Sequence, residues 1–230
     1  MPVLRQLPRW AWIGGGALAF VAGMVNAAGY LGFRHESLTN LTGTTSLLGV
    51  SLGLGEHAEA LHWGLSIAAF VAGAVLSGLI VEQRTLRLGR RYGVALVLES
   101  LLLFAAVPLL VETRALGLYA ASMAIGLQNG MVSTYSGMVF RTSHVTGIFT
   151  DLGIYIGQAL RGLTVDTLRV RVCVLVAGNF LCGGVAGSWL FGLLQERTLL
   201  VPATLTGVCG LVYGLYAHFR RSAPDGRGDD

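Results

Sequence analysis

The sequence predicts an all-α protein, a polytopic bundle of about six transmembrane helices, and three observations support this class. Hydrophobic residues make up 53% of the 230 residues and charged residues only 12%. A soluble domain carries about 25% charged residues, because its surface must be solvated. The apolar residues fall into blocks of roughly 19–25, the length that crosses about 30 Å of hydrocarbon. All 16 basic residues are arginines, and they gather at the ends of these blocks.

Six long apolar blocks are the expected spans. They cover Ala11–Phe33, Trp63–Val81, Tyr92–Val111, Ala115–Val139, Val172–Gly192 and Leu199–His218. Two shorter segments rich in Gly and Thr, Leu38–Gly55 and His144–Leu160, could cross as well. If neither crosses, thirteen arginines face the cytoplasm and only Arg34, Arg114 and Arg197 face outward. Because arginines favour the cytoplasmic side, we expect two non-crossing segments and both termini in the cytoplasm.

An internal repeat relates the two halves of the chain. The first half contains Gly23-Met-Val-Asn26, and the second contains Gly126-Leu-Gln-Asn129 at an offset of 103. Two Thr-Gly pairs follow, Thr42-Gly43 and Thr146-Gly147, at an offset of 104. Further along, Phe70-x-x-Gly73 matches Phe180-x-x-Gly183. Several matches in the same order indicate a structural repeat.

The repeat predicts how the chain is organised. Residues 1–10 form a cytoplasmic N-terminus, 11–111 and 112–218 are three-span repeats, and 219–230 are a charged cytoplasmic tail. An odd number of crossings in each half requires the halves to insert with opposite orientation. Inverted repeats of this kind are typical of secondary transporters, whose sites lie where the halves meet near the midplane. Each half then has one short non-crossing segment after its first span.

These motifs also resemble a known family. The chain is similar to the YoaK-like bacterial membrane proteins of unknown function in Gly126-Leu-Gln-Asn129, in Val145-Thr-Gly147, and in the matching Asn26 and Leu41-Thr-Gly43. The resemblance covers nearly the whole chain and implies a multispanning protein of the bacterial inner membrane. Members of that family carry an acidic residue where this chain has Asn26, and Asn where it has Thr44.

The repeated polar residues are the candidate substrate site. Asn26, Gln128 and Asn129 are amides within spans, where they either bond helices together or line a cavity. The pairs Thr42-Gly43 and Thr146-Gly147 either simply begin a helix or expose a helix N-terminus to a polar solute. Both alternatives stay open for both motifs.

Glu99 is the carboxylate expected deepest within a span, seven residues after Tyr92. Ionisable groups inside a membrane are costly and often mark a coupling or ligand site. Glu99 has no counterpart in the second half, so it is the candidate for proton coupling, and we expect it to line the same site as the asparagines and the two Thr-Gly pairs. The alternative is a carboxyl group that hydrogen-bonds a neighbouring helix.

Other polar residues are interpreted as structural. Asp151 is expected to neutralise Arg141 or Arg161, and residues 56–62 are expected to form a solvated outer loop and not a metal site. His35 and His144 are expected to make local hydrogen bonds. The cysteines are expected to be small core residues; they are Cys173, Cys182 and Cys209.

A small secondary transporter or permease for an unidentified solute is the function that these features favour. The alternative is a membrane scaffold or regulatory component, and an intramembrane enzyme is a third possibility without a motif to support it. No cofactor, no metal and no nucleic acid is expected, because no motif for them is present. The lipid bilayer and a homodimer are the expected partners, the dimer through a glycine-rich face of the fifth span. That face comprises Gly178, Gly183, Gly184 and Gly187.

Overall fold

The structure is a computed structural model that describes residues 9–32, 38–81, 91–136 and 142–222. Within these residues the chain is helical and contains no strand, which confirms the all-α class. The helices are α1 (Arg9–Gly32), α2 (Leu41–Gly53), α3 (His57–Ile80), α4 (Arg91–Glu112), α5 (Arg114–Ser136), α6 (Val145–Leu160), α7 (Thr167–Leu194), the short 3-10 helix η1 (Gln195–Leu199) and α8 (Leu200–Ser222).

Each predicted apolar block corresponds to one long helix, and each short segment forms a separate short helix. One boundary was wrong. The expected outer loop at residues 56–62 is helical from His57 onward, because Gly55 adopts φ +74° and ends the preceding turn. The residues that follow Gly55 include Ala58, Ala60 and Leu61, which are strong helix formers.

The long helices are compatible with a membrane protein. Four stretches of the described chain are long and apolar enough to cross a bilayer: Arg9–Gly32, His57–Ile80, Arg91–Glu112 and Thr167–Leu215. The last of these contains both α7 and most of α8. The 23-residue α5 is not among them, and it contains the adjacent amides Gln128 and Asn129.

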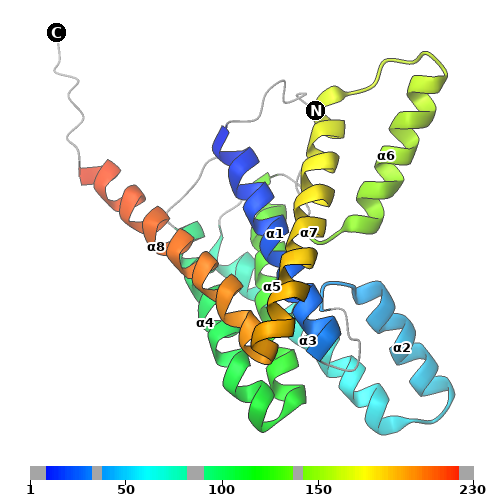
Figure 1. Cartoon of the computed structure of the whole chain (residues 1–230), viewed down its shortest axis with the longest axis vertical. Helices are drawn as coiled ribbons and strands as arrows, with labels where there is room; N and C mark the ends of the chain where they lie inside the picture. Colours follow the sequence, from blue (N-terminus) through cyan, green and yellow to red (C-terminus); the bar gives the residue numbers. More distant parts are fainter. Residues whose placement is uncertain (1–8, 33–37, 82–90, 137–141, 223–230) are drawn as a thin grey trace.

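The short helices are shorter than a usual membrane span. With 13 and 16 residues, α2 and α6 span about 20 and 24 Å at 1.5 Å per residue. The hydrocarbon core is about 30 Å thick. Figure 1 shows that both helices begin near the middle of the molecule and run toward opposite ends.

Helices from the two halves are paired with each other. The principal helix contacts are α1 with α7, α3 with α5, and α4 with α8 (Figure 1). In the described residues α1 does not contact α3, and α5 does not contact α7. The first two spans of each half are therefore held together by helices of the other half.

Glycines make these pairings possible, and they do so in equivalent places. A β-carbon on Gly23 of α1 would overlap the carbonyl oxygen of Phe180 on α7. In the other half, a β-carbon on Gly126 of α5 would overlap the carbonyl oxygen of Phe70 on α3. Close backbone approach of this kind requires a residue without a side chain. The two crossings thus use the glycines and phenylalanines that the repeat aligns.

Side chains at equivalent positions of the two halves are also exposed to the same degree. Residues 19–29 match residues 122–132 position by position as buried, half-buried or exposed. The same holds for 41–50 against 145–154, and for 66–81 against 176–191. The two halves are therefore packed in equivalent ways along α1 and α5, α2 and α6, and α3 and α7.

The glycine-rich face of α7 has a different use from the one expected. A β-carbon on Gly183 would overlap the carbonyl oxygen of Phe20, and one on Gly187 would lie 2.8 Å from Met24, both on α1. This face packs within the chain, so it is not available to a second copy. Gly178 has open space around it.

Two of the three cysteines were also placed wrongly. Cys173 is buried, whereas Cys182 and Cys209 are exposed on the surfaces of α7 and α8. In a membrane protein an apolar helix face can point to lipid, so an apolar neighbourhood in the sequence does not imply burial.

Candidate functional site

Two asparagines lie in equivalent positions on α1 and α5. The Oδ1 atom of Asn26 accepts hydrogen bonds from the Thr39 backbone N–H at 3.2 Å and from its hydroxyl at 2.9 Å. The Oδ1 atom of Asn129 accepts bonds from the hydroxyls of Thr142 at 3.3 Å and Ser143 at 2.9 Å. Each asparagine thereby ties a long helix to the turn that precedes a short one.

The short helices begin at these turns. Asn40 is the N-cap of α2, and its side chain accepts a bond from the Gly43 N–H at 3.3 Å. His144 is the N-cap of α6 and makes no side-chain cap bond. A β-carbon on Gly147 would overlap the His144 ring, and one on Gly43 would lie 2.9 Å from the Asn40 amide nitrogen. Glycine at both positions lets the N-cap side chain fold over the first turn of its helix.

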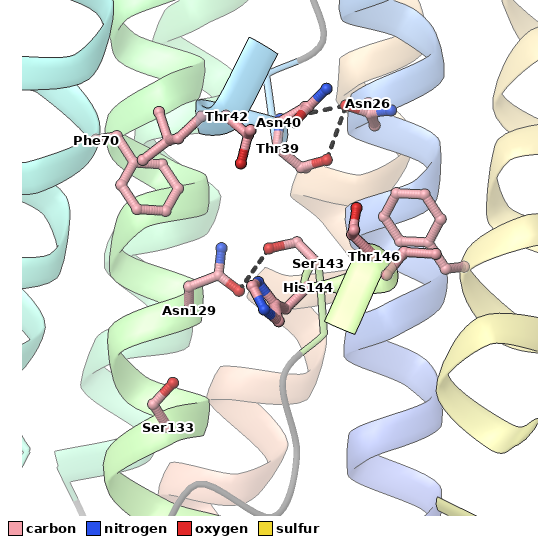
Figure 2. Close-up of a pocket in the computed structure, with 13 residues that line it drawn as sticks. Asn26, Thr39, Asn40, Thr42, Phe70, Asn129, Ser133, Ser143, His144 and Thr146 are labelled. Atoms are coloured by element: carbon pink, nitrogen blue, oxygen red, sulfur yellow. Dashed lines mark hydrogen bonds between the residues drawn. The ribbon is translucent and has the colours of Figure 1, made fainter. Parts of the chain in front are cut away.

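A cavity of about 680 Å³ lies between these elements. Its lining residues come from α1, α3, α5, α7 and the starts of α2 and α6; they are Asn26, Thr39, Asn40, Leu41, Thr42, Phe70, Asn129, Ser133, Ser143, His144, Val145, Thr146 and Phe180. Figure 2 shows Asn26 and Asn129 on opposite sides, with Thr39 and Ser143 pointing between them.

The lining consists almost entirely of equivalent pairs. Six pairs share the repeat offsets of 103, 104 or 110: Asn26 with Asn129, Thr39 with Ser143, Asn40 with His144, Leu41 with Val145, Thr42 with Thr146, and Phe70 with Phe180. Ser133 is the remaining lining residue. The cavity therefore lies where the two halves meet.

The predicted site residues divide into two groups. Asn26, Thr42, Asn129 and Thr146 line the cavity. Gly43 and Gly147 lie beneath the N-cap side chains and shape the helix starts.

Gln128 is directed elsewhere. Its side chain is 1% exposed, and its Nε2 donates to the Leu18 carbonyl oxygen at 2.6 Å. This hydrogen bond joins α5 to α1, so Gln128 bonds two helices together and does not line the cavity. Successive residues on a helix point about 100° apart, so the neighbours Gln128 and Asn129 face different surroundings.

Glu99 lies outside the cavity. It is 0% exposed on α4, and neither carboxyl oxygen has a hydrogen-bond partner among the described residues. The next residue, Ser100, donates to the Ala203 carbonyl oxygen on α8 at 2.7 Å. Glu99 is thus buried on α4, which packs against both α8 and α5.

The remaining polar residues have other surroundings. Asp151 is exposed on α6 and forms no ion pair with Arg161 in the described chain, while Arg141 and His35 lie outside the described residues. His62 of α3 makes a 2.8 Å hydrogen bond between its Nδ1 and the Tyr119 hydroxyl of α5.

Some lining residues carried no functional expectation. Phe70 and Phe180 are predicted only as repeat markers, His144 is predicted only to make local hydrogen bonds, and no prediction concerns Asn40. A signal existed for the last two, because each stands three residues before a Thr-Gly glycine, at the N-cap position. Ser133 has no such signal in the sequence.

A comparison with protein families gives one match. The family described as "Protein of unknown function (DUF1275)" matches residues 15–212. The chain belongs to DUF1275. This agrees with the resemblance to multispanning membrane proteins of unknown function. The DUF1275 match includes every residue that lines the cavity. No curated protein and no solved structure matches the chain.

Proposed function

We propose that this member of DUF1275 is a small secondary transporter or permease of the bacterial inner membrane. The observation that carries the proposal is the 680 Å³ cavity lined by six equivalent residue pairs. Inverted-repeat transporters bind their solutes where the halves meet, close to the ends of short or broken helices. This cavity is lined by residues of both halves, and the short helices α2 and α6 contribute their first residues to it.

In the proposed topology the six long helices cross and the short helices enter from opposite faces. The distribution of arginines supports this arrangement, with both termini in the cytoplasm. The opposite directions of α2 and α6 in Figure 1 support it as well. Each half has an odd number of crossings, so one half is inverted relative to the other.

The helix pairing suggests which parts move. α1 and α7 pack through Gly23 and Gly183, and α3 and α5 pack through Gly73 and Gly126. The lining residues Asn26 and Phe180 belong to the first pair, and Asn129 and Phe70 to the second. Rocking of one pair relative to the other would expose the cavity to each side in turn.

Glu99 is proposed as the coupling residue. It is a carboxylate without a described hydrogen-bond partner, buried on α4. Since it does not line the cavity, coupling would act through the packing of α4 against α8 and α5. A membrane scaffold, the alternative function, would need a packed interface between the asparagines, and the cavity argues against that.

Cysteine accessibility tests this function. Cys173, Cys182 and Cys209 are first replaced by Ala, and a single cysteine is introduced at Glu56, which follows α2, or at Leu163, which follows α6. We expect a membrane-impermeant thiol reagent to label the first from outside and the second from the cytoplasm. Labelling of both from one side would rule out inverted halves.

A third cysteine tests the alternating cavity. Thr42→Cys lies in the lining and is exposed within it. We expect it to react from either side of the membrane, and a matched cysteine at the fully buried Leu127 to react from neither. Reaction of Thr42→Cys from one side only, under all conditions, would contradict a transporter.

A further inference from the structure

The central cavity is lined mainly by amide, hydroxyl and apolar side chains. Its described lining contains three asparagines, five hydroxyl residues, four apolar residues and His144, and no aspartate, glutamate or arginine. A charged solute would lose hydration there and would meet no carboxylate or arginine, and an anion would meet only the partial positive charge of two helix N-termini. Burial of an unpaired charge is unfavourable, so the lining favours a neutral solute.

The polar groups offer donors and acceptors side by side. Ser143 donates its hydroxyl hydrogen to Asn129, so its oxygen still has lone pairs that can accept. The Asn129 oxygen is occupied by this bond, which leaves the amide N–H groups as donors. In Figure 2 the Asn129 nitrogen points away from Ser143. A solute hydroxyl both donates and accepts, and it matches such a lining better than a group that does only one.

Two phenylalanines add apolar surface beside these groups. The carbonyl oxygen of Phe180 lies against Gly23, one helical turn before Asn26. In the same way, Phe70 lies against Gly126, one turn before Asn129. Both phenylalanines also line the cavity, so the α1–α7 pair and the α3–α5 pair each contribute one phenylalanine and one asparagine to it. Sugars and sugar alcohols combine C–H surfaces with hydroxyl edges and fit this combination.

We infer that the cavity binds an uncharged, polyhydroxylated solute of the size of a sugar or sugar alcohol. The inference rests on the proposed transport function. The volume of about 680 Å³ lies within the usual range for small-molecule sites. Because equivalent groups line both halves, a solute with hydroxyls at both ends is bound by both.

Three solutes with the same carbon chain provide the test. Sorbitol, gluconate and glucamine differ only at one terminal carbon, which is an alcohol, a carboxylate or an ammonium group. The full chain is reconstituted into vesicles of phosphatidylethanolamine and phosphatidylglycerol, and uptake of each solute and of alanine is measured at neutral pH. We expect sorbitol to enter at least about tenfold faster than either ion, because burial of an unpaired charge is unfavourable.

A charge added to the lining should change this order. Asn129→Asp places a carboxylate in the cavity, so glucamine uptake should rise about tenfold relative to sorbitol. Asn179→Asp makes the same change on α7 outside the cavity and should leave the ratio unchanged. If Asn129→Asp does not fold, Thr146→Asp serves instead, because an acidic residue is tolerated in the first turn of a helix.

The outcomes separate this inference from the transport proposal. Uptake of gluconate, glucamine or alanine at least as fast as sorbitol would overturn the solute class but keep transport. Uptake of none of them, compared with protein-free vesicles, would overturn both. An unchanged ratio in both lining variants would show that the cavity does not select the solute.

Discussion

Asn26 accepts two hydrogen bonds from Thr39, one from its backbone N–H and one from its hydroxyl, across thirteen residues of chain. Asn129 stands in the same relation to Thr142 and Ser143 in the second half. In both cases one amide oxygen fixes the start of a short helix to the face of a long one. These hydrogen bonds therefore hold the two asparagines and the starts of the short helices in place around the cavity.

Replacing either asparagine should disconnect its short helix. Asn26→Ala removes two hydrogen bonds to Thr39, each worth about 1 kcal/mol net. We expect uptake in reconstituted vesicles to fall at least about tenfold, since about 1.4 kcal/mol corresponds to a factor of ten. Asn129→Ala should have a similar effect.

The matched control is Asn179→Ala on α7. Among the described residues its amide donates to the Leu175 carbonyl oxygen of its own helix and to no other group. We expect uptake close to that of the unaltered protein. Full uptake by Asn26→Ala, with the protein folded, would show that the bond to Thr39 has no role in transport.

Alanine at the contact glycines should destabilise the helix pairs. A β-carbon on Gly23 would overlap the Phe180 carbonyl oxygen, and overpacking of this kind costs about 1–3 kcal/mol. The apparent Tm in detergent should fall by several degrees, at about 2–4 °C per kcal/mol for a chain of this size. Intrinsic tryptophan fluorescence, followed during heating, measures this Tm.

Gly14→Ala, on the same helix, is the control for this change. No atom lies within 4 Å of the added β-carbon, and Ala favours helix over Gly by about 1 kcal/mol. The Tm of this variant should therefore equal or exceed that of the unaltered protein. Equal Tm values for the Gly23 and Gly14 variants would argue against close packing of α1 on α7.

Glu99→Gln tests the proposed coupling residue. The amide keeps the shape of the side chain but cannot release a proton, so uptake driven by a pH gradient should be lost. Counterflow of solute without a gradient should continue. Glu112→Gln, at the exposed end of α4, should retain gradient-driven uptake. Unchanged gradient-driven uptake in Glu99→Gln would remove Glu99 from the coupling mechanism.

The unequal caps of the short helices lead to a reciprocal prediction. Asn40 caps α2 through the Gly43 N–H, whereas His144 gives no side-chain cap bond to α6. His144→Asn should therefore raise the stability by about 0.5–1 kcal/mol, and Asn40→His should lower it by a similar amount. Thermal unfolding in detergent detects both changes. A fall in Tm for His144→Asn would show that the histidine ring stabilises α6 by other contacts.

Much of the fold was predictable because membrane helices have a strong sequence signal. Hydrocarbon excludes unpaired backbone groups, so long apolar runs must form helices. The distribution of arginines favoured leaving Leu38–Gly55 and His144–Leu160 out of the spans, and each forms a separate short helix. The paired motifs also predicted four cavity residues, Asn26, Thr42, Asn129 and Thr146.

Side-chain direction was not predictable in the same way. Gln128 and Asn129 are adjacent amides, yet the first bonds the Leu18 carbonyl oxygen and the second lines the cavity. Glu99 appeared as a candidate for the same region but is buried on α4 away from it. In lipid, the outward face of a helix is as apolar as the packed face, so periodicity does not show which way a residue points.

The sequence by itself determined the helical membrane class, the two short helices and the repeated Asn and Thr-Gly motifs, because these depend on local composition and on order along the chain. Only the tertiary structure decided that α1 packs on α7 and α3 on α5, and that Phe70 and Phe180 join the asparagines around one cavity. The physical reason is close packing. A glycine permits two backbones to meet, but its partner is fixed only when both surfaces fit. That fit depends on residues far apart in the sequence, such as Gly23 with Phe180 and Phe70 with Gly126.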